Sequence, residues 1–330
     1  MIISRTPLRI SFFGGGTDYP DYFERAPGAV LSTTIDKYVY ISLNRLSDFF
    51  DYKIRVGYSK SELVNSVDDI VHPSVRESLK FKKIDGNLDI HIFADLPART
   101  GLGSSSAFTV GFLNALYALE GHAVSSEKLA SDAIFVEQQL IGENVGSQDQ
   151  INAAYGGLNL IEFDASGFKV SPFIISGPKQ RALDDSTLIF YTGQMRYADE
   201  ILAEQVEHTK SQRNDSHLEK MYELVFEAVK IASNVSDNDF VKEFGQLLHE
   251  SWRFKKSLSS KVSNSTIDQA YEAAVDAGAY GGKIAGAGGG GFLMFIVRPE
   301  AKQKVRDALA SMLEVDFRFE THGSSVIYMR

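Results

Sequence analysis

The sequence predicts an α+β protein built from two domains, and three observations lead to this prediction. The chain has 330 residues, which is long for a single hydrophobic core. Its first third is rich in β-branched and aromatic runs that favour strands. Its second half opens with apolar residues at helical spacing and closes with strands. We place the domain boundary near residue 183, which gives domains of residues 1–183 and 184–330.

In the first domain, strands precede a block of helices. The strands are expected at residues 8–13, 30–43, 52–58 and 88–93. Helices are expected at 104–120, 126–141 and 148–155, followed by a strand pair at 157–163 and 168–175. A loop with Gly177, Pro178, Asp184 and Asp185 then leads into a buried strand at 187–192.

The second domain begins with helices, expected at 197–212, 215–232, 239–258 and 265–278. Within 215–232, residues such as Leu218, Met221 and Val225 form an apolar stripe that is typical of a core-facing helix. The chain then closes with strands at 282–286, 292–297, 315–320 and 324–329, and with a helix that starts at Pro299.

Composition narrows the class of protein. The formal net charge of −9 argues against a nucleic-acid partner, which requires a basic face. The chain has no cysteine, so disulfides, zinc–thiolate sites and a catalytic thiol are excluded. The N-terminus has no signal-peptide core, and the longest apolar stretch, 284–297, is too rich in glycine and too short to span a bilayer. We expect a cytoplasmic protein without a membrane partner, either a monomer or a homodimer.

The segment from Pro97 to Ala107 is the most informative part of the chain, because its glycines and hydroxyls stand directly before a helical run. A helix that begins at Ser104 or Ser105 would direct its free backbone N–H groups and the positive end of its dipole into this turn. Glycine lets a phosphate approach such a backbone, and small hydroxyls bind its oxygens or a magnesium ion. A Gly-Ser turn with an N-capping hydroxyl is the alternative interpretation.

A second glycine run, from Gly286 to Gly291, matches no standard nucleotide motif. The chain lacks the Gly-x-x-x-x-Gly-Lys-Ser/Thr string of a P-loop. The run satisfies Gly-x-Gly-x-x-Gly, but a strand follows it where a dinucleotide-binding fold requires a helix, and position 311 is serine. Two interpretations stay open: a tight hairpin between core strands, or a backbone that approaches a ligand or the other domain.

Near the N-terminus, a strand runs into Gly14-Gly15-Gly16-Thr17-Asp18. Arg9 and Asp18 are the charged residues of this otherwise apolar segment. Separately, Arg9 reads as a surface charge and Asp18 as a turn cap. Together they supply a cation for a transferring phosphate and a carboxylate for a sugar hydroxyl.

The segment 137–150 carries further carboxylates. Ser147 followed by Gln150 has the spacing of a capping box, so a helix is expected to start there with Asp149 in its first turn. An ionised carboxylate at that position can orient a hydroxyl or accept its proton, although stabilising the helix is the simpler role. Glu137 falls near the end of a predicted helix, where it opposes the dipole, which hints at Mg²⁺ binding.

The order of these segments, Gly-Gly-Gly-Thr-Asp, then Pro-x-x-x-Gly-Leu-Gly-Ser-Ser-Ser-Ala, then Lys283 followed by the second glycine run, resembles the GHMP kinase superfamily over nearly the whole chain. The resemblance implies an N-terminal domain like ribosomal protein S5 domain 2 and a ferredoxin-like C-terminal domain, with ATP between them. It implies a phosphate loop made of Gly101, Leu102, Gly103, Ser104, Ser105 and Ser106.

The same resemblance implies roles for the remaining residues. Ser105 and Glu137 would hold Mg²⁺, Asp149 would be the base or orienting group, and Arg9 would lie near the transferred phosphate. The implied substrate-binding set is Gly15, Gly16, Thr17, Asp18, Gly288 and Gly289.

Within the superfamily, the missing Glu-His pair before Thr17 disfavours free galactose. Gly146-Ser147-Gln148-Asp149-Gln150 and Trp252-Arg253-Phe254-Lys255 are most similar to the branch of bacterial D-glycero-D-manno-heptose 7-phosphate kinases, which phosphorylate O1 toward GDP-heptose. A sugar phosphate substrate needs fixed cations, for which Arg196 and either Lys255 or Lys256 are candidates, although each taken alone is more readily explained as a solvated surface charge. A kinase of an unphosphorylated sugar such as fucose, and a non-catalytic sensor of sugar or ATP, are the alternatives.

Overall fold

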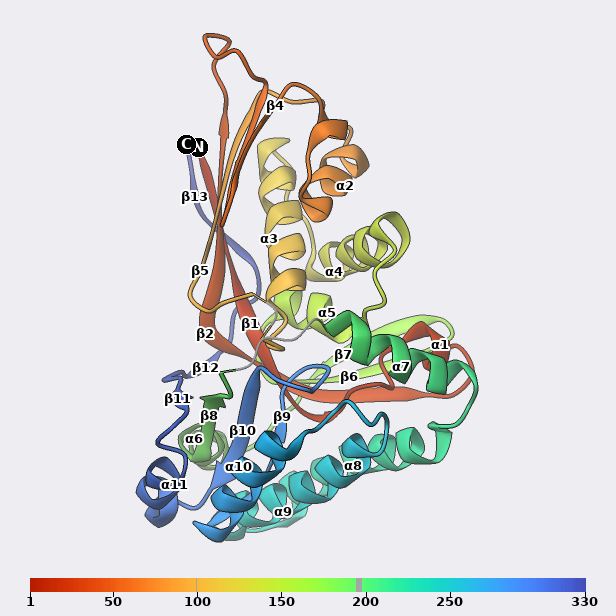
Figure 1. Ribbon diagram of the computed structural model, residues 1–330, viewed down its shortest axis with the longest axis vertical. Coiled ribbons are helices and arrows are strands. Elements are labelled where there is room, and N and C mark those ends of the chain that lie inside the picture. Colours follow the sequence, from red (N-terminus) through yellow and green to blue (C-terminus); the bar gives the residue numbers. More distant parts are fainter. Residues whose placement is uncertain (99, 194–197) are drawn as a thin grey trace.

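A computed structural model of the protein describes residues 1–98, 100–193 and 198–330, with the side chains of 198–202 excepted. It contains a large sheet and a smaller one (Figure 1). The main path of the large sheet runs in the order β13 (Ser325–Met329), β1 (Ile2–Gly14), β2 (Gly28–Arg45), β5 (Leu88–Ala94), β3 (Ile54–Gly57) and β4 (Ser61–Val64). Off this path, β2 also pairs with β6 (Asn159–Asp164) and β12 (Phe319–Glu320), and β6 pairs with β7 (Gly167–Pro172).

Helices cover one face of the large sheet, as Figure 1 shows. They are α2 (Pro73–Phe81), α3 (Ser104–Leu119), α4 (Ser126–Phe135) and α5 (Gln148–Tyr155). Alternate residues of β2, including Val39, Ile41 and Leu43, are buried on this side, as the two-residue period of a strand requires. Gly111 brings α3 close to β1, because a Cβ there would lie 2.5 Å from Thr6 Oγ1.

The smaller sheet is antiparallel in the order β11 (Leu313–Glu314), β8 (Thr187–Tyr191), β10 (Phe292–Val297) and β9 (Ala279–Ile284). The remaining helices are α1 (Pro20–Phe23), α6 (Gly177–Ser186), α7 (Ala198–Lys210), α8 (Asp215–Asn234), α9 (Asp237–Lys256), α10 (Ser265–Asp276) and α11 (Lys302–Ala308). This two-domain α+β architecture confirms the predicted fold class. No helix of the described residues has the length and apolar character that crossing a membrane requires.

The structure corrects two element predictions between residues 73 and 186. Residues 177–186 form α6 where a loop was expected, because the Ser176 hydroxyl caps the helix by accepting from the Lys179 N–H. Helix α2 was not foreseen, although Pro73 occupies its first turn as proline favours.

The last two strands of the chain, β12 and β13, do not join the smaller sheet that the rest of the C-terminal half forms. β12 pairs with β2 and β13 pairs with β1, so both belong to the large sheet. The expected strand at 315–320 is reduced to Phe319–Glu320. The boundary near residue 183 stays a prediction, and the pairing of β12 and β13 shows that the chain returns to the first sheet after leaving it.

Candidate active site

The turn before α3 leaves the start of that helix open. Gly103 is the N-cap residue, in the left-handed region at φ +76°, and no side chain of the described residues caps the helix. The helix begins at Ser104, as predicted. Because the first-turn N–H groups have no capping hydroxyl, the geometry favours an anion-binding turn over the capped Gly-Ser turn.

The two glycine runs pack against each other through their backbones. A Cβ at Gly101 would lie 2.5 Å from the Ala285 carbonyl oxygen, and one at Gly286 would lie 2.6 Å from Gly101 Cα. A Cβ at Gly291 would lie 2.3 Å from the Thr100 carbonyl oxygen. The second run is therefore a close approach between the two halves of the chain, and any side chain at these positions would separate them.

Gly288 and Gly289 face a different segment. A Cβ at Gly288 would lie 2.7 Å from the Val262 carbonyl oxygen, and the Gly289 N–H donates to the same oxygen at 2.8 Å. The Asn264 Nδ2 donates to the Gly289 carbonyl. The structure thus anchors these two predicted substrate-binding glycines on the 262–264 segment.

Arg9 brings β1, the phosphate loop and α5 together. Its Nε and Nη2 both lie 2.7 Å from Asp149 Oδ1, and its Nη1 donates to the Gly101 carbonyl oxygen at 2.7 Å. Arg9 is buried, whereas the Asp149 side chain keeps 26% of its surface exposed. Asp149 also lies against the loop, since a Cβ at Gly103 would be 3.3 Å from its Oδ2. The two predicted catalytic residues are therefore in contact beside the turn.

Asp18 is fully buried and its carboxylate is held from two sides. Oδ1 accepts from the Gly16 N–H at 2.8 Å, and Oδ2 accepts from Gln148 Nε2 at 3.0 Å. Burial, and then the nearby Asp149 charge, raise the pKa of Asp18. These two hydrogen bonds fix the glycine turn against the start of α5, so Asp18 stabilises the structure around the site.

The residues just before Asp18 differ in how tightly they are packed. Thr17 is buried and donates to the Ala29 carbonyl oxygen, and Gly16 packs against Leu218. Gly15 instead faces Gln148, whose Nε2 lies 3.7 Å from the position of a Cβ. Of this predicted substrate-binding group, Gly15 has the most open surroundings.

Glu137 lies in a π-helical turn, η2 (Val136–Ile141), which continues α4 and ends at Gly142. Its Oε2 accepts from Ser106 Oγ at 2.8 Å and from Gln150 Nε2, while its Oε1 is buried without a hydrogen-bond partner among the described residues. Burial is the main cause that raises the pKa of Glu137 to about 7, and the neighbouring Thr109, Ser106 and Gln150 side chains act against it. The serine in contact with Glu137 is Ser106, whereas Ser105 is exposed.

The expected capping box does not form, although α5 begins where it predicted. Ser147 is the N-cap residue without a side-chain capping bond, and its hydroxyl accepts from Gln138 Nε2. The reciprocal bond is absent because the Ser147 N–H donates to the Asp18 carbonyl oxygen at 3.0 Å, while the Gln150 side chain donates to Glu137. Asp149 is nevertheless in the first turn, as predicted.

Lys255 lies beside the second glycine run and is buried. Its Nζ donates to the Ile284 carbonyl oxygen at 3.1 Å and to the Gly286 carbonyl oxygen. Burial, followed by the charge of Arg9, lowers its pKa to about 7. Lys256 points elsewhere and pairs with Asp268 at 3.3 Å. Arg196 falls outside the described residues.

Two buried polar residues of this region belong to the sequence motifs but were not predicted to have a role in the site. Lys283 donates to the Phe12 carbonyl oxygen at 3.1 Å, and burial together with the Lys255 charge lowers its pKa well below the usual range. Its signal was a lysine inside a strand of otherwise small and apolar residues. Gln150 is the second. Its spacing from Ser147 indicated a capping box, so its contact with Glu137 was not predicted.

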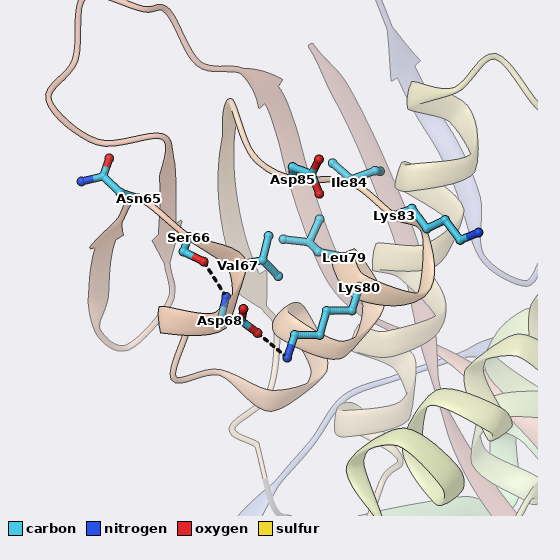
Figure 2. A pocket seen from close by; sticks show the side chains of 9 residues that line it. All are labelled: Asn65, Ser66, Val67, Asp68, Leu79, Lys80, Lys83, Ile84 and Asp85. Carbon is cyan, nitrogen blue, oxygen red and sulfur yellow. Dashed lines mark hydrogen bonds and ion pairs between the residues drawn. The ribbon is translucent and has the colours of Figure 1, made fainter.

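The hollow in Figure 2 lies away from these residues. It has a volume of about 480 Å³ and is bordered by η1 (Val67–Asp69), the end of α2 and the turn at residues 83–85. An ion pair between Lys80 and Asp68, 2.7 Å long, stands at its edge. None of the residues predicted for catalysis lines it.

Comparison with known proteins agrees with this geometry. The GHMP kinases N terminal domain matches residues 69–157, and the GHMP kinases C terminal domain matches residues 237–315. The chain is 33% identical to the D-glycero-alpha-D-manno-heptose 7-phosphate kinase of Campylobacter jejuni, over 98% of this chain and 97% of that protein. It is 25% identical to the L-fucokinase/L-fucose-1-P guanylyltransferase of Bacteroides fragilis, over 94% of this chain but 36% of that longer protein.

Solved structures show the same fold. A D-glycero-D-manno-heptose 1-phosphate kinase from Bacteroides thetaiotaomicron superposes over 100% of both chains with a TM-score of 0.79 and 23% identity. A putative sugar kinase from Campylobacter jejuni superposes over 99% of this chain and 98% of that one, with a TM-score of 0.73 and 29% identity.

Proposed function

The chain belongs to the GHMP kinase family and is a sugar kinase, and from that premise we propose that it transfers the γ-phosphoryl group of ATP to O1 of D-glycero-D-manno-heptose 7-phosphate. The product would be the 1,7-bisphosphate, on the way to GDP-heptose. The observation that carries the proposal is the contact of Asp149 with both Arg9 and the glycine turn, which places a carboxylate and a cation beside an open helix start. A cytoplasmic location accords with the use of ATP.

The residues divide the work of phosphoryl transfer between positioning and charge. The backbone N–H groups at the start of α3, with Ser104, Ser105 and Ser106, would bind the phosphates of ATP. Asp149 would orient the O1 hydroxyl or accept its proton through Oδ2, which makes no hydrogen bond within the described part of the chain. Arg9 would stabilise the charge on the transferring group while it holds Asp149 in place.

The surroundings of Glu137 fit Mg²⁺. Its Oε1 is a buried carboxylate oxygen that lacks a hydrogen-bond partner among the residues described, and carboxylate oxygens are the ligands that Mg²⁺ prefers. The Thr109 hydroxyl also lies beside Glu137, but it donates to the Ser105 carbonyl oxygen. We propose that Glu137 and a phosphate-loop serine would hold the ion, and the family resemblance favours Ser105 as that serine. Bound there, Mg²⁺ would neutralise charge on the nucleotide phosphates.

The phosphate already present on the substrate requires cations, and Lys255 supports this part of the proposal. A lysine has three N–H donors, of which Lys255 gives two to carbonyl oxygens. Lys255, Lys283 and Arg9 are all buried, close enough to lower the pKa values of the two lysines. An anion near this group would offset their mutual repulsion. Arg196 remains a second candidate.

The test is ADP release with Mg·ATP and a panel of acceptors: D-glycero-D-manno-heptose 7-phosphate, free mannoheptose, mannose 6-phosphate, L-fucose and galactose. Turnover with the heptose phosphate alone supports the proposal. Turnover with L-fucose, which the similarity to fucokinases favours as the second candidate, would keep the kinase and overturn the substrate. Turnover with none of the panel would overturn the proposed substrate class.

A further inference from the structure

The first turn of α5 contains a side chain that the proposed reaction has not used. Gln150 follows Asp149 directly, and it is fully buried. Its Nε2 donates to Glu137 Oε2, whereas its Oε1 is buried without a hydrogen-bond partner among the described residues. An amide oxygen in that condition lowers the stability of the fold, because it gives up its hydrogen bonds to water and gains none in return. Such a cost calls for a reason.

Glu137 presents the same feature. Ser106 and Gln150 both donate to Oε2 of its carboxylate, and Oε1 is a second buried acceptor without a hydrogen-bond partner among the described residues. Two acceptor oxygens without donors therefore belong to side chains that are hydrogen-bonded to each other. Another acceptor cannot satisfy them. A cation can, and so can the waters that a cation holds.

The chemistry of Mg²⁺ accounts for both oxygens at once. Mg²⁺ dehydrates reluctantly and is commonly held by one or two carboxylates, its remaining positions being filled by waters and substrate phosphates. Waters of that hydration shell are donors only, so they need acceptors nearby. Groups that orient a ligand and accept from the hydration shell tune metal affinity strongly.

We propose that Gln150 is a positioning residue for the metal ion: its Nε2 fixes the Glu137 carboxylate so that Oε1 faces the ion, and its Oε1 accepts from a water of the hydration shell. This rests on the proposed function for the presence of a nucleotide-bound divalent cation. It adds a physical link between the metal and the acceptor side of the reaction, because Gln150 and Asp149 are consecutive residues of one helical turn.

The experiment measures metal binding without any sugar. Mn²⁺ is titrated into the protein with AMP-PNP and followed by electron paramagnetic resonance, for the wild type and for Gln150→Leu and Gln150→Glu. We expect Gln150→Leu, which loses both donor and acceptor, to weaken Mn²⁺ binding about tenfold or more. Gln150→Glu loses the donor that fixes Glu137 but keeps an acceptor oxygen for the hydration shell, so it should weaken Mn²⁺ binding less than Gln150→Leu does.

Asn159→Leu is the matched control, because Asn159 is also a buried amide but donates to the Gly156 and Gly157 carbonyls. It should leave Mn²⁺ affinity within about twofold of the wild type even where it lowers the melting temperature. Unchanged affinity in Gln150→Leu, or an equal loss in Gln150→Leu and Gln150→Glu, would overturn the inference. So would absence of Mn²⁺ binding by the wild type. A wild type that binds Mn²⁺ and AMP-PNP but turns over no sugar would instead overturn the proposed substrate alone.

Discussion

Arg9 holds Asp149 by a single oxygen. Its Nε and Nη2 both contact Oδ1 at 2.7 Å, and its Nη1 reaches the Gly101 carbonyl at the same distance. The carboxylate is thereby fixed in orientation, while Oδ2 stays available beside Gly103. One guanidinium thus sets the distance between the group that would handle the acceptor hydroxyl and the turn that would hold the nucleotide.

The first prediction concerns Asp149→Asn. The amide keeps the shape of the side chain but cannot accept a proton from the acceptor hydroxyl, so kcat should fall about 100-fold or more. Nucleotide affinity should change little, because the phosphate loop and Glu137 are untouched. Steady-state kinetics together with AMP-PNP titration separate the two effects. A variant that retained nearly full kcat would show that Asp149 does not act as the base.

The second prediction concerns Arg9→Lys. Lysine keeps the charge but cannot bridge Asp149 and the Gly101 carbonyl with a planar fork, so the carboxylate loses its fixed orientation. We expect kcat to fall about 10- to 100-fold with a smaller change in KM for ATP. Arg9→Met, which also removes the charge, should lose more. Equal activity of Arg9→Lys and the wild type would mean that charge alone matters at this position.

The third prediction follows from the raised pKa of Glu137. Since the pKa rises from 4.5 in the unfolded chain to about 7 in the fold, the folded protein binds the proton more tightly. Ionisation of Glu137 should therefore cost stability as the pH rises from about 4.5 to about 7, with no further change above. Glu137→Gln removes this cost, so its advantage in free energy of unfolding over the wild type should grow across that interval.

Urea unfolding from pH 5 to 8, without metal, checks the sign. Glu143→Gln is a suitable comparison, because the Glu143 charge makes only a lesser contribution to the pKa of Glu137. Added Mg²⁺ and AMP-PNP should reverse the trend and stabilise the wild type more than Glu137→Gln as the pH rises. An advantage of Glu137→Gln that shrinks between pH 5 and 7 would contradict the prediction.

The fourth prediction concerns the segment before β13. The Ser324 hydroxyl lies 2.8 Å from Thr6 Oγ1 and accepts from Asn114 Nδ2 at 3.0 Å, and its backbone N–H donates to the Ala153 carbonyl. Ser324→Ala removes the side-chain bonds that join β1 to α3 and should lower the free energy of unfolding by about 1–2 kcal/mol. Ser325→Ala, which loses one bond to the Gly323 carbonyl, should cost less. Equal costs would show that the bonds to Thr6 and Asn114 stabilise the fold no more than the single bond of Ser325 does.

The sequence predicted the parts of the site that depend on local chemistry. The glycines and serines before an apolar helical run located the start of α3, and the Gly-Ser-Gln-Asp string located the start of α5. Both signals lie within a few residues of the structure they specify. The contact between Arg9 and Asp149 could be expected only from family resemblance, because 140 positions separate the two residues in the chain.

Side-chain contacts and strand pairings between distant segments could not be predicted from the sequence. Ser147 and Gln150 have the spacing of a reciprocal cap, but Gln138 and Glu137 compete for the same side chains and prevail. Ser105 and Ser106 are adjacent residues of the same type, so the sequence alone does not distinguish them. The orientation of α3 about its axis decides which hydroxyl reaches Glu137. The residues at 315–329 have the same strand preference in either sheet, so pairing with β1 and β2 could not be read from them.

The π-helical turn at Val136–Ile141 has a consequence for insertions and deletions. A turn of this kind holds one more residue than the α-helix around it, and each residue of an α-helix turns the chain by about 100°. Deleting a single residue between Phe135 and Glu137 would straighten the helix and swing the Glu137 carboxylate about a quarter turn away from Ser106 and Gln150. The number of residues in this one turn therefore sets the direction of the carboxylate, and a chain that lost one of them would lose the site even if it kept Glu137, Ser106 and Gln150.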